Sequence, residues 1–184
     1  MTTIGLAGAG TIGSGLIGLL NTSPAARNLR LKAVLVRDLA RPRPGIPAGT
    51  PLTACCGELT DDPEIDIVVE LLGGVDEAFG VVSRALSQGK AVVTANKNLL
   101  AERGPELFAL AAKYKAPVGF EASVCAGIPI IRTLQEALRA DRITSLEGIV
   151  NGTTNYLLTR MSEERASYQD CLADAQRLGL AEPD

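Results

Sequence analysis

A group of glycines near the N-terminus has the spacing of a dinucleotide-binding turn. Gly8-Ala9-Gly10-Thr11-Ile12-Gly13 follows a short apolar segment and opens a helix-like one, which is the context that the G-x-G-x-x-G pattern needs. Gly8 permits a tight turn, Gly10 leaves room for a pyrophosphate beside the backbone, and Gly13 lets helix and strand pack closely. The helix N-terminus then offers free N–H groups and a positive dipole to the phosphates. The pattern predicts a Rossmann-type cofactor site, although glycines near strand ends also arise from ordinary turns.

The end of the second expected strand bears on which nicotinamide dinucleotide is bound. An acidic residue at this place binds the ribose hydroxyls of NAD, whereas an arginine accommodates the 2′-phosphate of NADP. Arg37 comes first after Val34-Leu35-Val36, and Arg41 and Arg43 follow closely. We therefore expect a preference for NADP, with NAD as the alternative if the strand runs one residue further and Asp38 takes the ribose. Ordinary solvated loops also carry arginines of this kind.

Lys97 is the candidate catalytic side chain. It ends the run Thr94-Ala95-Asn96-Lys97 after an apolar segment, which places it at the carboxyl edge of a parallel sheet, where α/β proteins bind ligands. The chain contains no histidine, so Ser-His-Asp and Cys-His nucleophile arrangements and the commonest transition-metal ligand are excluded. Chemistry must therefore rest on lysine, carboxylates or a cofactor. A lysine at this position is equally common as a plain surface residue.

The elements that must position these residues follow a strand-helix alternation. Near-continuous apolar segments with helical segments between them indicate a parallel sheet covered by helices. We predict an α/β fold, a Rossmann-type doubly wound parallel sheet. The expected strands are residues 3–7, 31–36, 65–71, 91–94 and 117–120, and the expected helices are residues 12–20, 75–87 and 99–113.

The pattern changes after Glu121, where a second domain is expected to begin. We place the boundary near residue 125, so that residues 1–125 form the NAD(P)-binding domain and residues 126–184 the start of the next one. The proline-rich residues 38–53 predict a surface loop after the second strand. Later elements are a helix at 128–140, a strand at 143–150, and helices at 155–164 and 168–178.

Composition and charge exclude several classes of protein. The 184 residues, 46% of them hydrophobic, suffice for one domain and part of a second. The net charge of −3 comes from basic and acidic residues mixed along the chain, which argues against a nucleic-acid partner. Neither a signal-peptide pattern nor a run of eighteen apolar residues occurs, so we expect a cytoplasmic protein with no membrane partner. The four cysteines form no C-x-x-C pair, and we expect free or buried thiols.

Four further motifs give the chain a specific resemblance to a known family. They are Thr94-Ala95-Asn96-Lys97, Glu121-Ala122-Ser123-Val124, Asn151-Gly152-Thr153-Thr154-Asn155-Tyr156 and Ala181-Glu182-Pro183-Asp184. With the glycine-rich turn they occur in this order in homoserine dehydrogenases, which the chain resembles from Ile4 to Asp184. The resemblance implies a Rossmann domain followed by the beginning of an α+β substrate and dimerisation domain. It also implies reversible hydride transfer between NAD(P)H and aspartate 4-semialdehyde, giving homoserine on the path to threonine, methionine and isoleucine.

The resemblance implies roles for individual residues. Lys97 matches the family lysine beside nicotinamide and substrate, where an ammonium polarises the carbonyl or assists proton movement. The expected cofactor-binding residues are Gly8, Ala9, Gly10, Thr11, Ile12, Gly13, Arg37, Leu72, Gly73, Thr94 and Lys97. The expected substrate-binding residues are Gly152, Thr153 and Glu182, and a sodium ion is implied at Glu121 and the backbone carbonyls of Val124, Ala126 and Ile128.

Several of these residues have structural alternatives. Glu121 is placed to cap the following helix, and Thr153 to act as a helix N-cap. Glu182 matches a carboxylate that contacts the amino group of the substrate, a charge-assisted pairing. Cys125 stands where the family has small residues, and we interpret it as a packing thiol because no histidine is there to activate it.

The chain ends before the family's catalytic region is complete. In the family, the residues after the Ala-Glu-Pro-Asp motif supply further carboxylates, a proton-donating lysine and the strands of a dimerisation sheet. We therefore expect this chain to be weakly active or inactive by itself, and the full-length form to be a homodimer acting on a small-molecule substrate. The alternatives are a non-catalytic NAD(P)-binding module and another NAD(P)-dependent oxidoreductase of a small semialdehyde. The absence of histidine and the Asn-Gly-Thr-Thr-Asn-Tyr turn count against the latter.

Overall fold

The computed structural model describes residues 1–181. Backbone contacts divide the chain into two compact units, Met1–Ile131 and Arg132–Asp184, and each is described by itself. The predicted domain boundary near residue 125 lies slightly earlier in the chain and stays a prediction.

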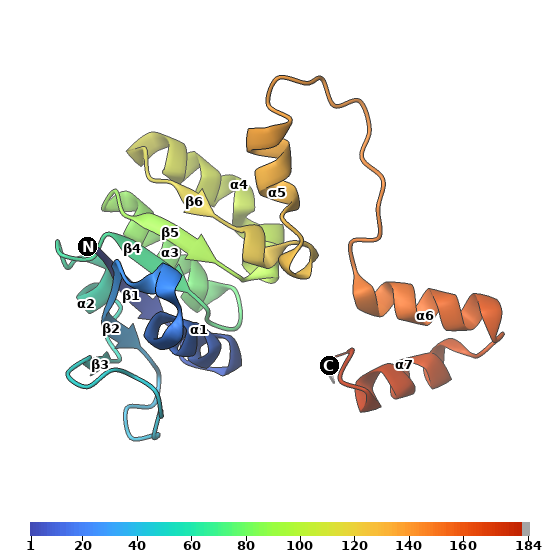
Figure 1. Cartoon of the computed structure of the whole chain (residues 1–184), viewed down its shortest axis with the longest axis horizontal. Coiled ribbons are helices and arrows are strands. Elements are labelled where there is room, and N and C mark those ends of the chain that lie inside the picture. Colours follow the sequence, from blue (N-terminus) through green and yellow to red (C-terminus); the bar gives the residue numbers. More distant parts are fainter. Residues whose placement is uncertain (182–184) are drawn as a thin grey trace. The chain divides into compact units, whose positions relative to one another are not determined.

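The first unit is built on a parallel sheet with the strand order β3-β2-β1-β4-β5-β6 (Figure 1). The order reverses between β1 and β4, so the topological switch point lies beyond the carboxyl ends of these two strands. The predicted α/β fold is confirmed. The strands are β1 (Thr2–Ala7), β2 (Leu29–Leu35), β3 (Leu52–Thr53), β4 (Ile67–Glu70), β5 (Ala91–Thr94) and β6 (Val118–Gly119).

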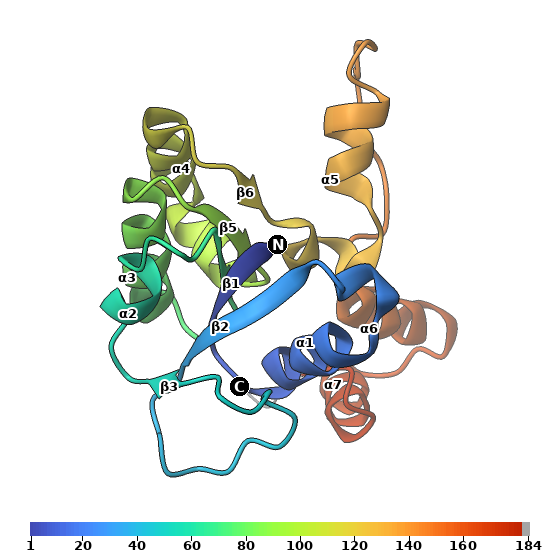
Figure 2. The same ribbon diagram turned by 60° about the vertical axis from the view of Figure 1, so that its left-hand side comes forward.

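Helices cover both faces of this sheet, as Figure 2 shows. One apolar core packs against α1 and includes Leu6, Ile17 and Val34. The other lies on the side of α2, α3 and α4 and includes Leu86 and Leu99. Two cores arise because strands of a buried parallel sheet present apolar side chains to both faces. The helices are α1 (Thr11–Thr22), α2 (Gly57–Thr60), α3 (Asp76–Ser87) and α4 (Lys97–Tyr114), with a 3₁₀ turn, η1, at Pro24–Ala26.

Two short elements were not predicted. The loop expected over residues 38–53 ends in β3, whose two residues pair with Val34 and Leu35 of β2. Helix α2 follows after a single turn. Both are too short to produce a hydrophobic period, so their positions depend on the neighbouring strand and helices rather than on local pattern.

The predicted strand at residues 143–150 is wrong. The structure has no regular element between residues 142 and 150, and Ile143, Leu146, Ile149 and Val150 are exposed. A strand needs a neighbour to pair its N–H and C=O groups, and no strand among the described residues pairs with this segment. The helix expected at 128–140 is also shorter, with one turn, α5 (Ile130–Arg132), that continues into a π-helical turn, η4 (Thr133–Ala137).

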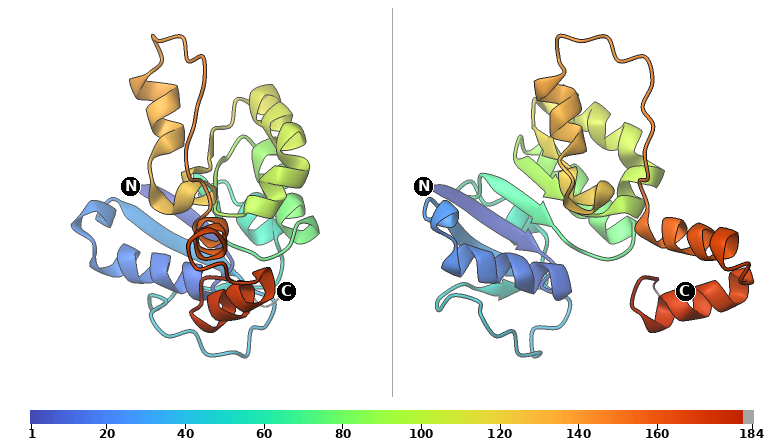
Figure 3. Two further views of the ribbon diagram at one scale, coloured as in Figure 1. Left: turned by 90° about the vertical axis from the view of Figure 1, so that its right-hand side faces the viewer. Right: turned by 45° about the vertical axis from the view of Figure 1, so that its right-hand side comes forward.

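The second unit contains a helical hairpin of α6 (Gly152–Glu163) and α7 (Tyr168–Arg177), folded back on each other in Figure 3. Both predicted helices are confirmed, but α6 begins earlier than expected. Asn151 is its N-cap, because its side chain accepts a hydrogen bond from Thr154 N at 2.7 Å. The alternative of Thr153 as the N-cap is therefore wrong, since Thr153 already lies inside the helix.

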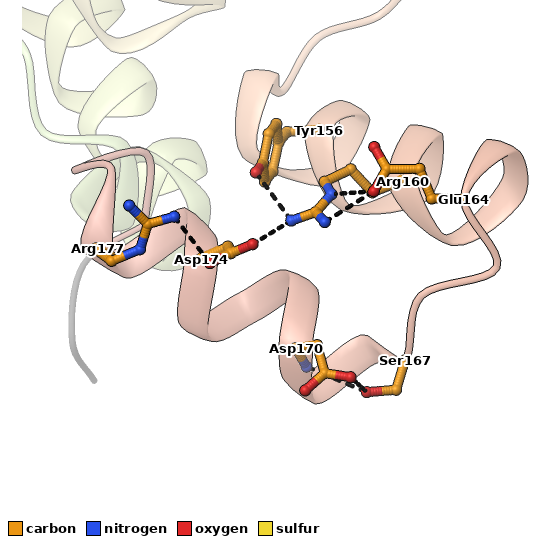
Figure 4. A network of polar contacts seen from close by, with 7 residues as sticks. All are labelled: Tyr156, Arg160, Glu164, Ser167, Asp170, Asp174 and Arg177. Atoms are coloured by element: carbon orange, nitrogen blue, oxygen red, sulfur yellow. Dashed lines mark hydrogen bonds and ion pairs between the residues drawn. The ribbon is translucent and has the colours of Figure 1, made fainter.

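Arg160 joins the two helices of the hairpin, as Figure 4 shows. Its guanidinium donates to Glu164 one turn further along α6 and to Asp174 on α7. It also donates to the Tyr156 hydroxyl at 3.3 Å. On α7, Asp174 accepts a second charged hydrogen bond from Arg177 at 3.0 Å. Asp174 thus links α7 to α6 through Arg160.

We expect Asp174→Asn to loosen this hairpin. Arg160, and then Arg177, lower the pKa of the Asp174 carboxyl below its ordinary value. The stabilisation is therefore complete above that ordinary value and is lost as the pH falls through the lowered pKa. At pH 7, hydrogen exchange followed by mass spectrometry should show faster exchange of amides in 152–177 and unchanged exchange in residues 1–131. Asp141→Asn is the control, because Asp141 makes no ion pair within residues 1–181. Equal exchange rates in the two variants would contradict the conclusion that the Asp174–Arg160 ion pair holds the hairpin together.

Candidate cofactor-binding site

Three glycines shape the turn between β1 and α1. Gly8 has a φ of +100°, and a Cβ added to it would lie 2.5 Å from the carbonyl oxygen of Leu71. A Cβ on Gly13 would collide with the carbonyl oxygen of Gly8. At Gly10, by contrast, nothing lies within 4 Å of an added Cβ. Neighbouring backbone atoms therefore leave no space for a side chain at Gly8 and Gly13, whereas the space beside Gly10 is open.

The first turn of α1 faces this open space with unpaired donors. Gly10 is the N-cap and contributes no side chain, and the first N–H bonded within the helix is that of Ser14, to Gly10 O at 2.8 Å. The N–H groups of Thr11, Ile12 and Gly13 precede it, where helix geometry provides no intrahelical acceptor. Thr11 and Ile12 are exposed. Such a helix end is suited to an anion.

A cavity of about 250 Å³ lies at the carboxyl ends of β1, β2 and β4. This is the edge at which the strand order reverses, where ligands bind in open α/β sheets. It brings together six of the predicted cofactor residues, namely Gly8, Ala9, Gly10, Arg37, Leu72 and Gly73. The other lining residues are Val36, Asp38, Arg41, Arg43, Leu71 and Glu77.

The rim of the cavity beyond β2 is rich in arginine. Arg43 Nη1 donates to the carbonyl oxygens of Asp38 at 2.7 Å and Arg41 at 2.8 Å, so this side chain holds the loop in shape. The Asp38 carboxylate accepts the N–H of Ala40 at 2.9 Å. Arg37 and Arg41 are exposed and form no ion pair within residues 1–181. The cavity lining therefore carries three arginines and the two carboxylates Asp38 and Glu77, which leaves a net positive charge.

A buried polar network ties the ends of β4 and β5 together. Glu70 is fully buried, and its two carboxylate oxygens accept hydrogen bonds from Leu72 N at 2.7 Å and from the Thr94 hydroxyl. Burial raises the pKa of the Glu70 carboxyl above its ordinary value. Sequence analysis did not identify Glu70. The available signal was a single carboxylate between the apolar residues 67–69 and 71–72, because a charged residue is rarely buried without a partner.

Lys97 is the first residue of α4 and is exposed. Asn96 caps the helix, accepting the N–H of Leu99 at 3.0 Å, and so fixes where α4 and Lys97 begin. Neither Lys97 nor Thr94 lines the cavity described above. Thr94 is fully buried, and its hydroxyl contacts Glu70 rather than open space.

The residues implied for sodium lie on two successive 3₁₀ turns, η2 (Glu121–Ser123) and η3 (Cys125–Gly127). Glu121 Oε1 accepts Ile131 N at 2.9 Å, which is the capping role that the sequence left open. The carbonyl of Ile128 accepts Ile130 N at 2.8 Å. Val124 and Ala126 are the other two residues of the set. In residues 1–181, no group of three or more histidines, cysteines, aspartates or glutamates is arranged to hold a metal.

The residues expected to bind substrate belong to the second unit. Gly152 is the first residue of α6 and is exposed, and the Thr153 hydroxyl donates to the carbonyl oxygen of Leu180. Glu182 lies outside the described residues. All four cysteines are free thiols. Within the described residues, none of the helices has the length and apolar character needed to cross a membrane.

Comparison with protein families matches both parts of the chain. Residues 8–121 match the family model described as the NAD binding domain of homoserine dehydrogenase. Residues 129–184 match the model described as homoserine dehydrogenase. The first match alone covers more than half of the chain.

Relatives and solved structures agree with these matches. The homoserine dehydrogenase of Bacillus subtilis is 43% identical over 98% of this chain, and that of Corynebacterium glutamicum is 40% identical over 98%. The chain spans 43% and 42% of their respective lengths. The crystal structure of a homoserine dehydrogenase from Thiobacillus denitrificans superposes with a TM-score of 0.88 at 44% identity, over all of this chain and 44% of that one. A hyperthermophilic archaeal homoserine dehydrogenase in complex with NADPH gives a TM-score of 0.80 at 28% identity, over all of this chain and 63% of that one.

Proposed function

This chain belongs to the homoserine dehydrogenase family, and on that premise we propose that it is the cofactor-binding part of an enzyme that interconverts aspartate 4-semialdehyde and homoserine with NAD(P)H. The observation that carries the proposal is the cavity at the switch point, where the glycine turn, the end of β2 and the loop after β4 meet. Membership of the homoserine dehydrogenase family supports aspartate 4-semialdehyde and homoserine as the proposed substrate pair. Because the chain spans less than half of its curated relatives, we propose that it is weakly active or inactive by itself.

Different residues of the chain have different roles in the proposed reaction. Gly10 leaves space for the pyrophosphate, and the free N–H groups at the start of α1 donate hydrogen bonds to its oxygens. The nicotinamide, when bound, supplies the hydride to the aldehyde carbon or takes it back. Lys97 presents an ammonium at the carboxyl edge of the sheet, where it polarises the carbonyl oxygen. Gly152, Thr153 and Glu182 hold the substrate, as the resemblance implies.

NADP is the proposed preferred cofactor, with NAD as the alternative. Support comes from the charge at the rim: Arg37 and Arg41 are exposed and form no ion pair within the described residues, so both can meet a 2′-phosphate. We expect Arg37→Ala to weaken NADPH binding about tenfold, the loss of one charge-assisted contact, and to change NADH binding less than about twofold. Arg30→Ala, at the opposite end of β2, is the matched control for net charge. Equal affinities of the wild type for NADPH and NADH would refute the preference.

A sodium ion at Glu121 and the carbonyls of Val124, Ala126 and Ile128 remains part of the proposal, together with a homodimer of the full-length form. The donor set consists of oxygen atoms only, which suits a hard cation. The capping bond from Ile131 N to Glu121 uses one carboxylate oxygen.

The deciding experiment is the NADPH-dependent reduction of aspartate 4-semialdehyde by this 184-residue chain, beside direct titrations with NADPH and NADH. Binding without turnover is the expected result. Turnover at the rate of a full-length relative would refute the proposal that the chain needs further residues. Binding of neither nucleotide would refute the cofactor site itself.

A further inference from the structure

The carboxylate of Glu70 is buried without a cation beside it. Its exposed fraction is 0%, and it forms no ion pair within the described residues. Both of its oxygens are nevertheless used: one accepts the N–H of Leu72 at 2.7 Å and the other the hydroxyl of Thr94. Burying a carboxyl group is costly unless hydrogen bonds replace those that it made to water, and these two contacts do so.

Thr94 extends these contacts from β4 to β5 and beyond. Its hydroxyl donates to Glu70 and accepts the N–H of Asn96 at 3.0 Å. Its carbonyl oxygen accepts the hydroxyl of Ser123 at 2.8 Å. Thr94 therefore uses both its side chain and its backbone to bind segments that are far apart in the sequence.

Asn96 completes the connection by reaching back to the loop after β4. Its side-chain amide donates to Gly74 O at 2.7 Å and, more weakly, to Leu72 O at 3.4 Å. The oxygen of the same amide caps α4 through Leu99 N. A single side chain thus sets both the shape of the 72–74 loop and the start of the helix that carries Lys97.

The loop held by these contacts packs directly against the glycine turn. A Cβ on Gly8 would meet Leu71 O at 2.5 Å and Leu72 N at 3.1 Å, so the Leu71–Leu72 peptide leaves no space at Gly8. The same Leu72 N–H is the one bound by Glu70. Leu71, Leu72 and Gly73 also line the cavity. A shift of this peptide would therefore alter the wall of the cavity and the turn together.

We propose that Glu70, Thr94 and Asn96, here called the Glu70 network, are positioning residues that hold the 71–74 loop against the glycine turn and thereby set the affinity for the nicotinamide dinucleotide. This inference rests on the proposed function. None of the three side chains needs to contact the cofactor, since each acts through the loop or through the start of α4.

Thr94→Val is the first test, because it removes the hydroxyl and keeps the shape of the side chain. NADPH affinity is followed by the fluorescence of the reduced nicotinamide, which no tryptophan obscures because the chain has none. We expect the dissociation constant to rise about tenfold in Thr94→Val and to stay within about twofold in Thr94→Ser, which keeps the hydroxyl. Asn96→Ser, which retains a good N-cap but loses the amide donors, should also weaken binding severalfold.

Thr53→Val is the matched control. Thr53 is a buried threonine at the end of β3, and its hydroxyl oxygen accepts the N–H of Cys55 at 2.9 Å, but its turn does not line the cavity. It should lose thermal stability like Thr94→Val while keeping NADPH affinity. An equal loss of NADPH affinity in Thr53→Val and Thr94→Val would overturn the proposal. Wild-type NADPH affinity in both Thr94→Val and Asn96→Ser would overturn it as well. If Thr94→Val does not fold, the affinity of Asn96→Ser alone decides. Failure of the proposed function is distinguishable from failure of this inference, because the wild type would then bind neither NADPH nor NADH.

Discussion

Gly8→Ala should abolish measurable NADPH binding and lower the free energy of unfolding by roughly 2–4 kcal/mol. Two costs combine at this position: the φ of +100° strains any residue with a Cβ, and that Cβ overlaps the carbonyl of Leu71. The only ways to relieve the overlap are to move the 71–72 peptide or to open the turn. Urea unfolding monitored by circular dichroism, beside NADPH titration below the transition, measures both effects.

Gly10→Ala separates binding from folding at the same turn. Gly10 has an ordinary φ of −81°, and an added Cβ meets nothing within 4 Å. The free energy of unfolding should therefore change by less than about 0.5 kcal/mol. NADPH affinity should nevertheless fall at least about tenfold, because the methyl group occupies space that the pyrophosphate needs. Unchanged NADPH affinity in Gly10→Ala would show that the pyrophosphate does not approach this residue.

Leu99→Ala should destabilise the chain by about 3 kcal/mol, the usual cost of a Leu→Ala cavity in a packed core. Leu99 is fully buried in the first turn of α4 and belongs to the core on the α3 and α4 side of the sheet. The cavity would also loosen the helix turn that begins at Lys97. Urea unfolding gives the magnitude from the shift of the midpoint at constant slope.

Leu19→Ala is the control for this change, since Leu19 also lies within a helix but is 61% exposed. Its free energy of unfolding should change by less than about 0.5 kcal/mol. Similar losses for Leu99→Ala and Leu19→Ala would mean that the core does not extend to the start of α4.

Local sequence was sufficient for most of the first unit. Each of the five predicted strands overlaps an observed one, and the helices over α1, α3 and α4 begin within two residues of their predicted starts. The helices are long enough for hydrophobic period to identify them, and the strands were recognised as near-continuous apolar runs. Where period is short or misleading, prediction failed: β3 and α2 were missed, and residues 143–150 have the composition of a strand but no partner to pair with.

The amino-acid sequence by itself determined the glycine turn, the order of the longer strands and helices of the first unit, and the resemblance to a family, because each depends on consecutive residues. Only the tertiary structure decided which groups Glu70, Thr94 and Asn96 contact. Glu70 and Thr94 are 24 positions apart, as are Asn96 and Leu72, and their contacts exist because β4 and β5 end side by side at one edge of the sheet. The local sequence pattern does not predict which loops meet at this edge. The burial and the hydrogen bonds of a carboxylate depend on residues that are distant in the sequence and that only the fold brings close.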